Sequence, residues 1–391
     1  MIKRPKVLSI GHSYVVASNR AIMRQVAQLG EFEIELAAPS FLHGSLRSLE
    51  LESEADFRYD QKLNVIPLNV YFSKKIHIMY YCGLKKLITQ NKYDLVHIWE
   101  EPYVLGGYQI ARRCFQTQTP YFFRTAQSLN KKYPFPFSYF EKFVLQNSSG
   151  WNAGASLVYQ NLLNRGYPPE SGVIINLGTD KNIFYPDAND RESIRAELGV
   201  EGFVIGFSGR LVESKGLDVL MDALKILKKY TSEKWFFLVL GSGPYHDKIL
   251  SWAQENNFSD RVVVRLASHD EMPRFMRAMD CLVAPSQTAK NWKEQFGRMI
   301  TEAFATKVPV IGSTSGEIPF VIDKAGLVVE EKDSSGWAQA IAKLMNSESL
   351  CQEFQDEGYK RFLKNYDVSR VARQYADFYR QIIDSKQLDN I

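Results

Sequence analysis

Two successive sets of short apolar runs, rich in β-branched and aromatic residues, constrain the fold of this chain more than any other feature. The first set covers residues 6–11, 32–38, 64–68, 94–100, 120–125 and 151–155, and the second covers 203–209, 235–241, 261–267, 280–286, 308–313 and 326–331. Segments with helical spacing, such as 217–230, lie between most of them. Strands alternating with helices in this way are typical of parallel sheets covered on both faces. The sequence therefore predicts two doubly wound, Rossmann-like α/β domains that face each other across a cleft.

The boundary between the two domains is expected near residues 172–186. This segment begins as a strand and then breaks at Gly178, Asp180 and Pro186, after which a new helical pattern begins. A length of 391 residues also exceeds the roughly 250 to 300 residues that one core usually serves. We expect a first domain over residues 1–182, a second over 183–365, and a C-terminal helix within 366–391 that braces the two.

Composition narrows the class of protein further. The longest apolar runs are far shorter than the ~18 to 20 residues that a membrane-spanning helix needs. The four cysteines, Cys82, Cys114, Cys281 and Cys351, lie far apart without metal-binding or redox spacing, which favours a reducing, cytoplasmic location. Residues 1–181 hold 21 Lys and Arg against 14 Asp and Glu, whereas residues 182–391 hold 27 against 30. The basic first half suggests an anionic partner, but the net charge of +4 without a basic stripe argues against nucleic acid.

The loop after the strand at 203–209 carries the first candidate site. In the stretch GRLVESKG, Gly209 and Arg210 open the loop, and Lys215 and Gly216 close it just before a helix. Glycine allows the backbone to approach a ligand closely, and two cations beside a helix N-terminus suit a doubly charged anion such as a diphosphate. An ordinary surface loop with basic residues is the alternative interpretation of this stretch taken alone.

The stretch EQFGRMITE (294–302) follows the strand at 280–286 and makes the diphosphate interpretation stronger. Two carboxylates, Glu294 and Glu302, flank a helix start whose first free amides lie at Gly297 to Met299. Carboxylates close to a phosphate site are explained if they accept hydrogen bonds from ribose and sugar hydroxyls. The order would be ribose at Glu302, diphosphate at the helix start, and sugar at Glu294, which describes a nucleotide-sugar. A capping Glu294 and a solvent-facing Glu302 are the alternative.

These stretches, together with VPVIGSTSGEIP (308–319), resemble the retaining nucleotide-sugar glycosyltransferases of GT-B architecture, glycosyltransferase family 4 or "group 1". The resemblance covers the C-terminal domain and is looser in the N-terminal domain. It implies a metal-independent, hexosyltransferase-type enzyme without cofactor that moves a sugar, with retention, from a nucleotide-diphosphate donor to a hydroxyl acceptor. The product would be a polysaccharide or glycolipid precursor, the N-terminal domain would bind the acceptor, and the C-terminal domain would bind the donor.

The resemblance also implies roles for individual residues. Arg210 and Lys215 would stabilise the diphosphate leaving group, and Glu294 would hold a hydroxyl of the donor sugar. The remaining donor-binding residues would be Gly209, Phe296, Gly297, Arg298 and Glu302. No metal-binding Asp-x-Asp occurs in the chain, in agreement with chemistry that needs no metal.

Candidates on the acceptor side follow the strands of the first domain. They are His12, Tyr14, Glu100, Glu101 and Gln127, each of which could equally be a packed or exposed loop residue. Gln127 stands where many members of the family have a histidine, and an amide cannot carry a proton as a general acid does. The donor base, the sugar, the acceptor, the linkage and the oligomeric state remain open at this level.

Two segments point to peripheral membrane contact through the basic N-terminal domain. Residues 73–90 show a helical apolar face with lysines elsewhere, and KKYPFPFSYF (131–140) couples two lysines to aromatic residues. A core-facing helix and a packed loop are the simpler interpretation. Two other function classes stay open: a nucleotide-sugar epimerase of the same architecture, and a non-catalytic two-domain protein that binds a sugar or nucleotide.

Overall fold

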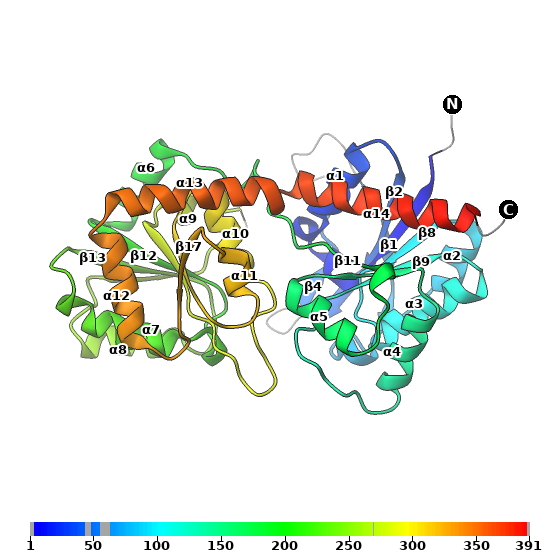
Figure 1. Cartoon of the computed structure of the whole chain (residues 1–391), viewed down its shortest axis with the longest axis horizontal. Coiled ribbons are helices and arrows are strands. Elements are labelled where there is room, and N and C mark those ends of the chain that lie inside the picture. The colour runs from blue at the N-terminus through cyan, green and yellow to red at the C-terminus, as the bar shows by residue number, and fades with distance from the viewer. Residues whose placement is uncertain (1–3, 44–47, 55–62, 269, 389–391) are drawn as a thin grey trace. The chain divides into compact units, whose positions relative to one another are not determined.

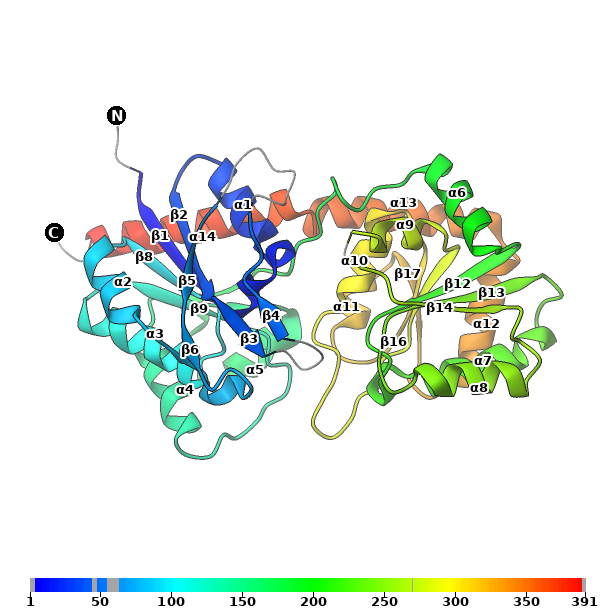
Figure 2. The same ribbon diagram turned by 180° about the vertical axis from the view of Figure 1, so that it is seen from behind.

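The chain folds into two α/β units (Figures 1 and 2). The computed structural model describes residues 4–43, 48–54, 63–268 and 270–388. Unit 1 comprises residues 1–178 and 368–391, and unit 2 comprises residues 179–367. The chain thus changes unit four residues before the first expected boundary and two residues after the second. The terminal helix, α14 (Val368–Leu388), belongs to unit 1, and its bracing of the two domains stays a prediction.

Unit 1 is built on a seven-stranded sheet of order β11-β10-β9-β8-β1-β2-β5, in which all neighbouring strands are parallel. The strands are β1 (Lys6–Ile10), β2 (Glu33–Pro39), β5 (Asn64–Leu68), β8 (Leu95–Ile98), β9 (Tyr121–Thr125), β10 (Gly150–Ala153) and β11 (Gly172–Ile174). The strand order reverses between β1 and β8, and ligands of doubly wound sheets bind at such a switch point, beyond the carboxyl ends of the strands.

Helices cover both faces of the unit 1 sheet. One face packs on α1 (Ala21–Gln28) and α14 through a core that includes Met23, Phe122 and Tyr379. The other face packs on α2 (Leu84–Asn91), α3 (Leu105–Gln116), α4 (Phe137–Gln146) and α5 (Ser156–Asn164). Two small antiparallel ribbons complete the unit: β3 (Phe41–His43) with β4 (Ser48–Glu50), and β6 (Val70–Tyr71) with β7 (Tyr80–Tyr81).

Unit 2 repeats the plan with a six-stranded parallel sheet of order β14-β13-β12-β15-β16-β17. The strands are β12 (Phe203–Ser208), β13 (Trp235–Leu240), β14 (Val262–Arg265), β15 (Cys281–Ala284), β16 (Val310–Ser313) and β17 (Gly326–Val329). The helices are α6 (Ala188–Leu198), α7 (Leu217–Ile226), α8 (His246–Glu255), α9 (Met272–Arg277), α10 (Arg298–Ala305), α11 (Ile318–Ile322), α12 (Ser334–Met345) and α13 (Glu348–Asn365). The switch point of this sheet lies between β12 and β15.

The expected fold class is confirmed, because each apolar run singled out in the sequence forms a strand of one of the two large sheets. The helix expected over residues 73–90 is wrong in its first half. Residues 70–81 form the β6–β7 ribbon around a short 3-10 turn at Ile76–Ile78, and α2 begins only at Leu84. Gly83, at φ +81, occupies the left-handed conformation just before α2, which separates the two parts. Among the described residues, no helix is both long and apolar enough to cross a membrane.

Candidate active site

The loop after β12 reaches the switch point of unit 2 and places Lys215 there. The backbone after β13 packs directly against the start of the loop that carries Lys215. A Cβ added to Gly241, after β13, would lie only 1.9 Å from the carbonyl oxygen of Gly209. At the end of the Lys215 loop, Gly216 has φ +70, and a Cβ there would lie 1.8 Å from the oxygen of Pro285. Glycine is therefore required sterically at both positions. The two loops that flank the switch point meet at Gly216.

Lys215 and Glu294 form a buried ion pair at this point. The Lys215 Nζ lies 2.5 Å from Glu294 Oε2, and the Ser286 hydroxyl donates to the same carboxylate at 2.7 Å. The ammonium also lies 5.3 Å from the centroid of the Trp292 ring. Buried charges persist in proteins when they are paired and hydrogen-bonded. The pair brings together one residue from each loop of the switch point, at the position where a ligand is expected.

The loop that carries Glu294 is fixed through its backbone. Gly316 has φ +59, and a Cβ there would lie 2.0 Å from the carbonyl oxygen of Glu294. The same oxygen accepts a hydrogen bond from the amide of Glu317 at 3.1 Å. The stretch after β16 thus acts as a support for Glu294.

Helix α10 begins where the sequence predicts. Gly297 precedes it at φ +82, a left-handed conformation, and Phe296 is buried with its ring 5.7 Å from that of Tyr366. The first amides of the helix have no intrahelical acceptor, as at every helix start. Thr301, one turn further on, is buried, and its Oγ1 forms a hydrogen bond of 2.8 Å with Oγ1 of Thr179. The helix is therefore held at both its start and its buried face.

Arg298 and Glu302 lie one turn apart on α10. Burial raises the pKa of the Glu302 carboxyl above its usual range, and the charge of Arg298 acts in the opposite direction. A partly buried carboxyl of this kind can accept hydrogen bonds from neutral hydroxyls with little competition from water. The placement fits the ribose-binding role that the sequence predicts for Glu302, which stays a prediction.

Arg210 differs from Lys215 in its surroundings. Its side chain is exposed, and no carboxylate in the described part of the chain lies within ion-pair distance of it. A guanidinium without a partner, beside a paired ammonium, is available to a phosphate group. Arg210 and Lys215 lie on the same short loop, so both can serve one diphosphate.

Unit 1 has a matching arrangement at its own switch point. His12, after β1, meets Glu100, after β8: the backbone amide donates to Oε1 at 2.7 Å and Nδ1 lies 2.7 Å from Oε2. The hydroxyl of Tyr81 donates to the same carboxylate at 2.5 Å. The structure therefore brings two of the predicted acceptor-side residues into direct contact.

Glu101 and Gln127 lie nearby on the same unit. The Glu101 carboxylate accepts hydrogen bonds from Thr125 Oγ1 at 2.5 Å and from the amide of Ala126 at 2.8 Å. Burial raises its pKa, an effect that these hydrogen bonds oppose. Gln127 uses its side-chain oxygen to accept from the amide of Leu129 at 3.1 Å. Both residues hold the loop after β9 in shape.

Tyr14 is the one predicted acceptor-side residue that the structure removes from consideration. Its side chain is fully buried in the core between the unit 1 sheet and α14, and its hydroxyl bonds to Ser9 Oγ at 2.9 Å. The sequence placed it correctly in the loop after β1. However, residues 12–15 form a 3-10 turn there, which points Tyr14 into the core.

Several residues at these sites were missed by the sequence reasoning. Ser286 and Trp292 complete the surroundings of the Lys215–Glu294 pair, and Tyr81 completes those of Glu100. Arg124, at the end of β9, lies over the Trp99 ring at 4.9 Å. Ser286 and Arg124 stand at the carboxyl ends of predicted strands, so their positions could have suggested them. Tyr81 and Trp292 reach their sites only through tertiary contacts and carried no such signal.

We expect the contact between His12 and Glu100 to make stability depend on pH. Burial lowers the pKa of His12, but the charge and hydrogen bond of Glu100 raise it more, so that the net shift is upward. The pair therefore stabilises the fold fully below about pH 6.5, and the contribution is lost as pH rises through the raised pKa. Thermal unfolding of the wild type and of His12→Asn should differ more at pH 5.5 than at pH 9. The exposed His246 offers a control, and an equal difference at both pH values would contradict the expectation.

The part of the chain that the structure describes contains no group of three or more His, Cys, Asp or Glu side chains able to hold a metal ion. Metal independence of the reaction is nevertheless a matter for experiment and stays a prediction.

Comparison with known proteins agrees with this site. Residues 190–361, which contain it, match the family described as "Glycosyl transferases group 1". A glycosyltransferase of Methanocaldococcus jannaschii is 27% identical over 248 residues, 63% of each chain, so that less than two thirds of that relative is covered. The capsular polysaccharide biosynthesis glycosyltransferase CapM of Staphylococcus aureus is 26% identical over 84% of this chain and 88% of its own.

Solved structures extend the likeness to the whole chain. A glycosyltransferase from Rickettsia africae superposes with a TM-score of 0.77 at 19% identity, covering 97% of this chain and 99% of that one. Anabaena HepE, solved in complex with UDP, superposes with a TM-score of 0.76 at 17% identity, covering 95% of this chain and 98% of that one. These likenesses show the fold, which is GT-B. The family match over residues 190–361 and the named relatives show that this chain is similar to the group 1 glycosyltransferases.

Proposed function

We propose that this chain transfers a sugar from a nucleotide-diphosphate donor to a hydroxyl group of a polysaccharide or glycolipid precursor. The observation that carries the proposal is the meeting of Lys215 and Glu294 at the switch point of unit 2. The exposed Arg210 and the first amides of α10 belong to the loops and helix that meet there. Cations and helix amides suit a diphosphate, and carboxylates suit sugar hydroxyls.

The chemistry follows from the charges that develop as the donor breaks. Cleavage of the bond between sugar and diphosphate leaves negative charge on the phosphate oxygens and positive charge on the sugar. Arg210 and Lys215 would stabilise the former, and Glu294 would lie beside the latter. Because Glu294 already neutralises Lys215 in the free enzyme, the ammonium keeps its place and orientation before the donor arrives. Preorganised charge of this kind lowers the barrier without reorganisation during the reaction.

Several finer features of the proposal rest on the resemblance in sequence and on the relatives. Retention and metal independence are implied by the family. The donor base stays open: HepE was solved with UDP and UDP-glucose, whereas a relative from Mycobacterium tuberculosis is named for GDP-mannose. The acceptor class follows relatives named for capsular polysaccharide and lipopolysaccharide core biosynthesis. The four cysteines are all unpaired thiols, which supports a reducing compartment such as the cytoplasm.

A thermal-shift titration tests the donor site directly. UDP, GDP, ADP and their common sugar conjugates are added to the wild type and to Arg210→Ala/Lys215→Ala. We expect one nucleotide family to raise Tm, by an amount set by its concentration relative to Kd, and the double variant to lose this shift. Lys228→Ala/Lys229→Ala, which removes two exposed lysines of the same unit, is the matched control and should keep the shift. No shift with any nucleotide in folded wild type would overturn the proposal.

The nucleotide identified in this way then defines an activity assay. With the corresponding labelled sugar donor and a membrane or polysaccharide extract as acceptor, we expect label to appear in the acceptor fraction and to persist in EDTA. Conversion of the donor to an isomer without transfer would indicate an epimerase. Tight donor binding with no turnover under any condition would indicate a binding protein instead.

A further inference from the structure

The β6–β7 ribbon of unit 1 exposes large aromatic side chains. Tyr71 is 64% and Phe72 67% exposed, and their rings lie 6.5 Å apart. Phe72 has φ +60, a conformation that non-glycine residues adopt rarely. Tyr80 on the partner strand and Ile76 in the intervening turn are 38% and 37% exposed. The ribbon thus presents apolar rings to solvent instead of burying them in the core beside it.

The loop before α4 and the first turn of α4 present a second group of exposed rings next to the ribbon. Phe135 is 83% exposed, the highest value of any large apolar side chain described, and Tyr139 is 49% exposed. The two segments are joined by ring contacts. The ring centroid of His77, on the ribbon, lies 6.3 Å from that of Phe137 and also 6.3 Å from that of Tyr103. The two stretches that the sequence singled out for lipid contact, 73–90 and 131–140, therefore meet in one region.

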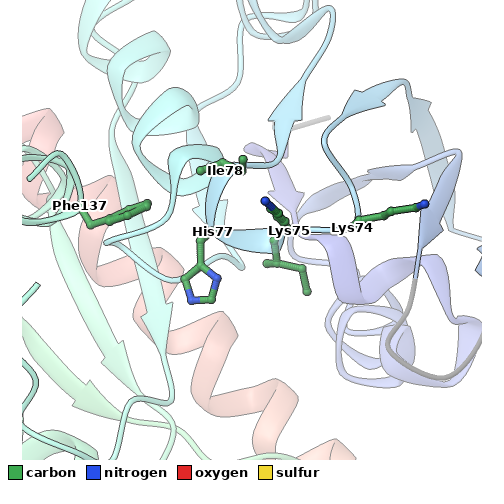
Figure 3. A pocket seen from close by; sticks show the side chains of 6 residues that line it. Lys74, Lys75, His77, Ile78 and Phe137 are labelled. Atoms are coloured by element: carbon green, nitrogen blue, oxygen red, sulfur yellow. The ribbon is translucent and has the colours of Figure 1, made fainter. Parts of the chain in front are cut away.

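We call this region the aromatic–basic surface. Its members are Tyr71, Phe72, Lys74, Lys75, Ile76, His77, Tyr80, Lys132, Phe135, Phe137 and Tyr139. An open hollow of about 600 Å³ lies within it. In Figure 3, His77 lies between Phe137 and the two lysines that line this hollow. Its lining residues are aromatic and aliphatic ones together with two lysines. A hollow of this kind suits groups that are apolar at one end and anionic at the other.

The charge of the surface has one sign. Residues 69–93 contain five lysines and no Asp or Glu, and residues 126–140 contain two lysines and no Asp or Glu. Lys74, Lys75 and Lys132 are exposed, and within the described residues none of them pairs with a carboxylate. Lysines on most protein surfaces are interspersed with acids. Two neighbouring segments that carry lysines and no acids are complementary to an anionic partner.

We infer that the aromatic–basic surface docks unit 1 on an anionic lipid bilayer. Aromatic rings prefer the interface between headgroups and acyl chains, and lysines beside them bind anionic headgroups. An exposed apolar patch rimmed by charge marks an interaction site in a soluble domain. The inference does not depend on the proposed transfer reaction. If both hold, however, the acceptor is a lipid-linked molecule presented at the membrane surface.

Vesicle flotation of the full chain tests this inference. We expect the protein to float with vesicles that contain about a third phosphatidylglycerol in phosphatidylcholine, and not with phosphatidylcholine alone. Each lysine near a charged bilayer contributes roughly fivefold to binding at moderate salt. Lys74→Glu/Lys75→Glu should therefore weaken the partition coefficient by about twentyfold or more, and raised salt should weaken that of the wild type.

A second variant separates the apolar contribution from the charges. Phe72→Ser/Phe135→Ser removes the two most exposed rings and should lower binding to anionic vesicles while leaving the net charge unchanged. Lys228→Glu/Lys229→Glu and Leu266→Ser, at exposed positions of unit 2, are the matched controls and should bind as the wild type does. Circular dichroism and thermal unfolding report that each variant is folded. Absence of flotation with anionic vesicles, equal flotation with neutral ones, or wild-type binding by both surface variants would overturn the inference.

Discussion

Replacing Lys215 with alanine is expected to lower kcat by about a hundredfold or more, the usual cost of removing one group that stabilises developing charge. The ammonium is held 2.5 Å from Glu294, at the junction of the two loops that flank the unit 2 switch point. If the ammonium interacts with the diphosphate more strongly in the transition state than in the ground state, its removal lowers kcat and does not act on KM alone. Initial rates at saturating donor measure the effect.

The same substitution leaves Glu294 buried without its cation, so a structural loss must be distinguished from a catalytic one. Glu294→Gln, alone and combined with Lys215→Ala, completes a double-mutant cycle. Melting temperatures of the four proteins report stability, and their rates report catalysis. Lys229→Ala should leave both unchanged. A Lys215→Ala enzyme with normal kcat, or one whose activity returns fully when Glu294 is also neutralised, would contradict a direct role for Lys215 at the leaving group.

Much of the fold could be predicted from the sequence because buried parallel strands leave a strong local signal. Runs such as 235–240 are apolar throughout, which identifies a strand covered on both faces. The loops after β12 and β15 could also be predicted as sites, since they follow strands and carry glycine beside charged residues. No local pattern in the sequence reveals the strand order that brings these loops together. It follows from the doubly wound topology that the alternation of strands and helices implies.

Two predictions from the sequence are wrong, and each has its own physical cause. Residues 73–90 carry a helical apolar pattern, yet the first half pairs as a ribbon and the helix begins at Leu84, because Gly83 adopts a left-handed conformation. Periodicity cannot show such an interruption. Tyr14 follows a strand as a ligand-binding residue would, but the 3-10 turn directs it into the core. Side-chain direction in an irregular loop depends on tertiary packing that one sequence does not reveal.

The contact between Lys215 and Glu294 is a third case, in which both residues were identified but their relation was not. The sequence assigned the lysine to the diphosphate and the glutamate to the sugar, as separate contacts along the donor. The structure pairs them directly, with Ser286 as a third partner. Their distance of 79 residues in the chain explains why no spacing could suggest this. The pairing links the two roles, because any change at one residue alters the electrostatic environment of the other.

Gly316→Ala is expected to destabilise unit 2 and to weaken donor binding together. At φ +59 an alanine costs about 1 to 2 kcal/mol by itself, because its Cβ disfavours the left-handed conformation. In addition, the new Cβ would lie 2.0 Å from the carbonyl oxygen of Glu294, a backbone atom that cannot rotate away. The loop must therefore shift, and the Glu294 carboxylate shifts with it. We expect a lowered Tm and a weaker nucleotide-induced shift.

Gly199→Ala separates the two causes. Gly199 lies in the same unit at φ +63, but a Cβ there would meet nothing within 4 Å, so alanine would incur only the conformational cost. Thermal melts and donor titrations of both variants give the comparison. Gly316→Ala should lose more stability than Gly199→Ala and should alone lose affinity for the donor. Equal melting temperatures with equal donor affinity would mean that the backbone contact with Glu294 does not position the site. A greater loss of stability with normal affinity would mean that Glu294 makes no contact with the donor.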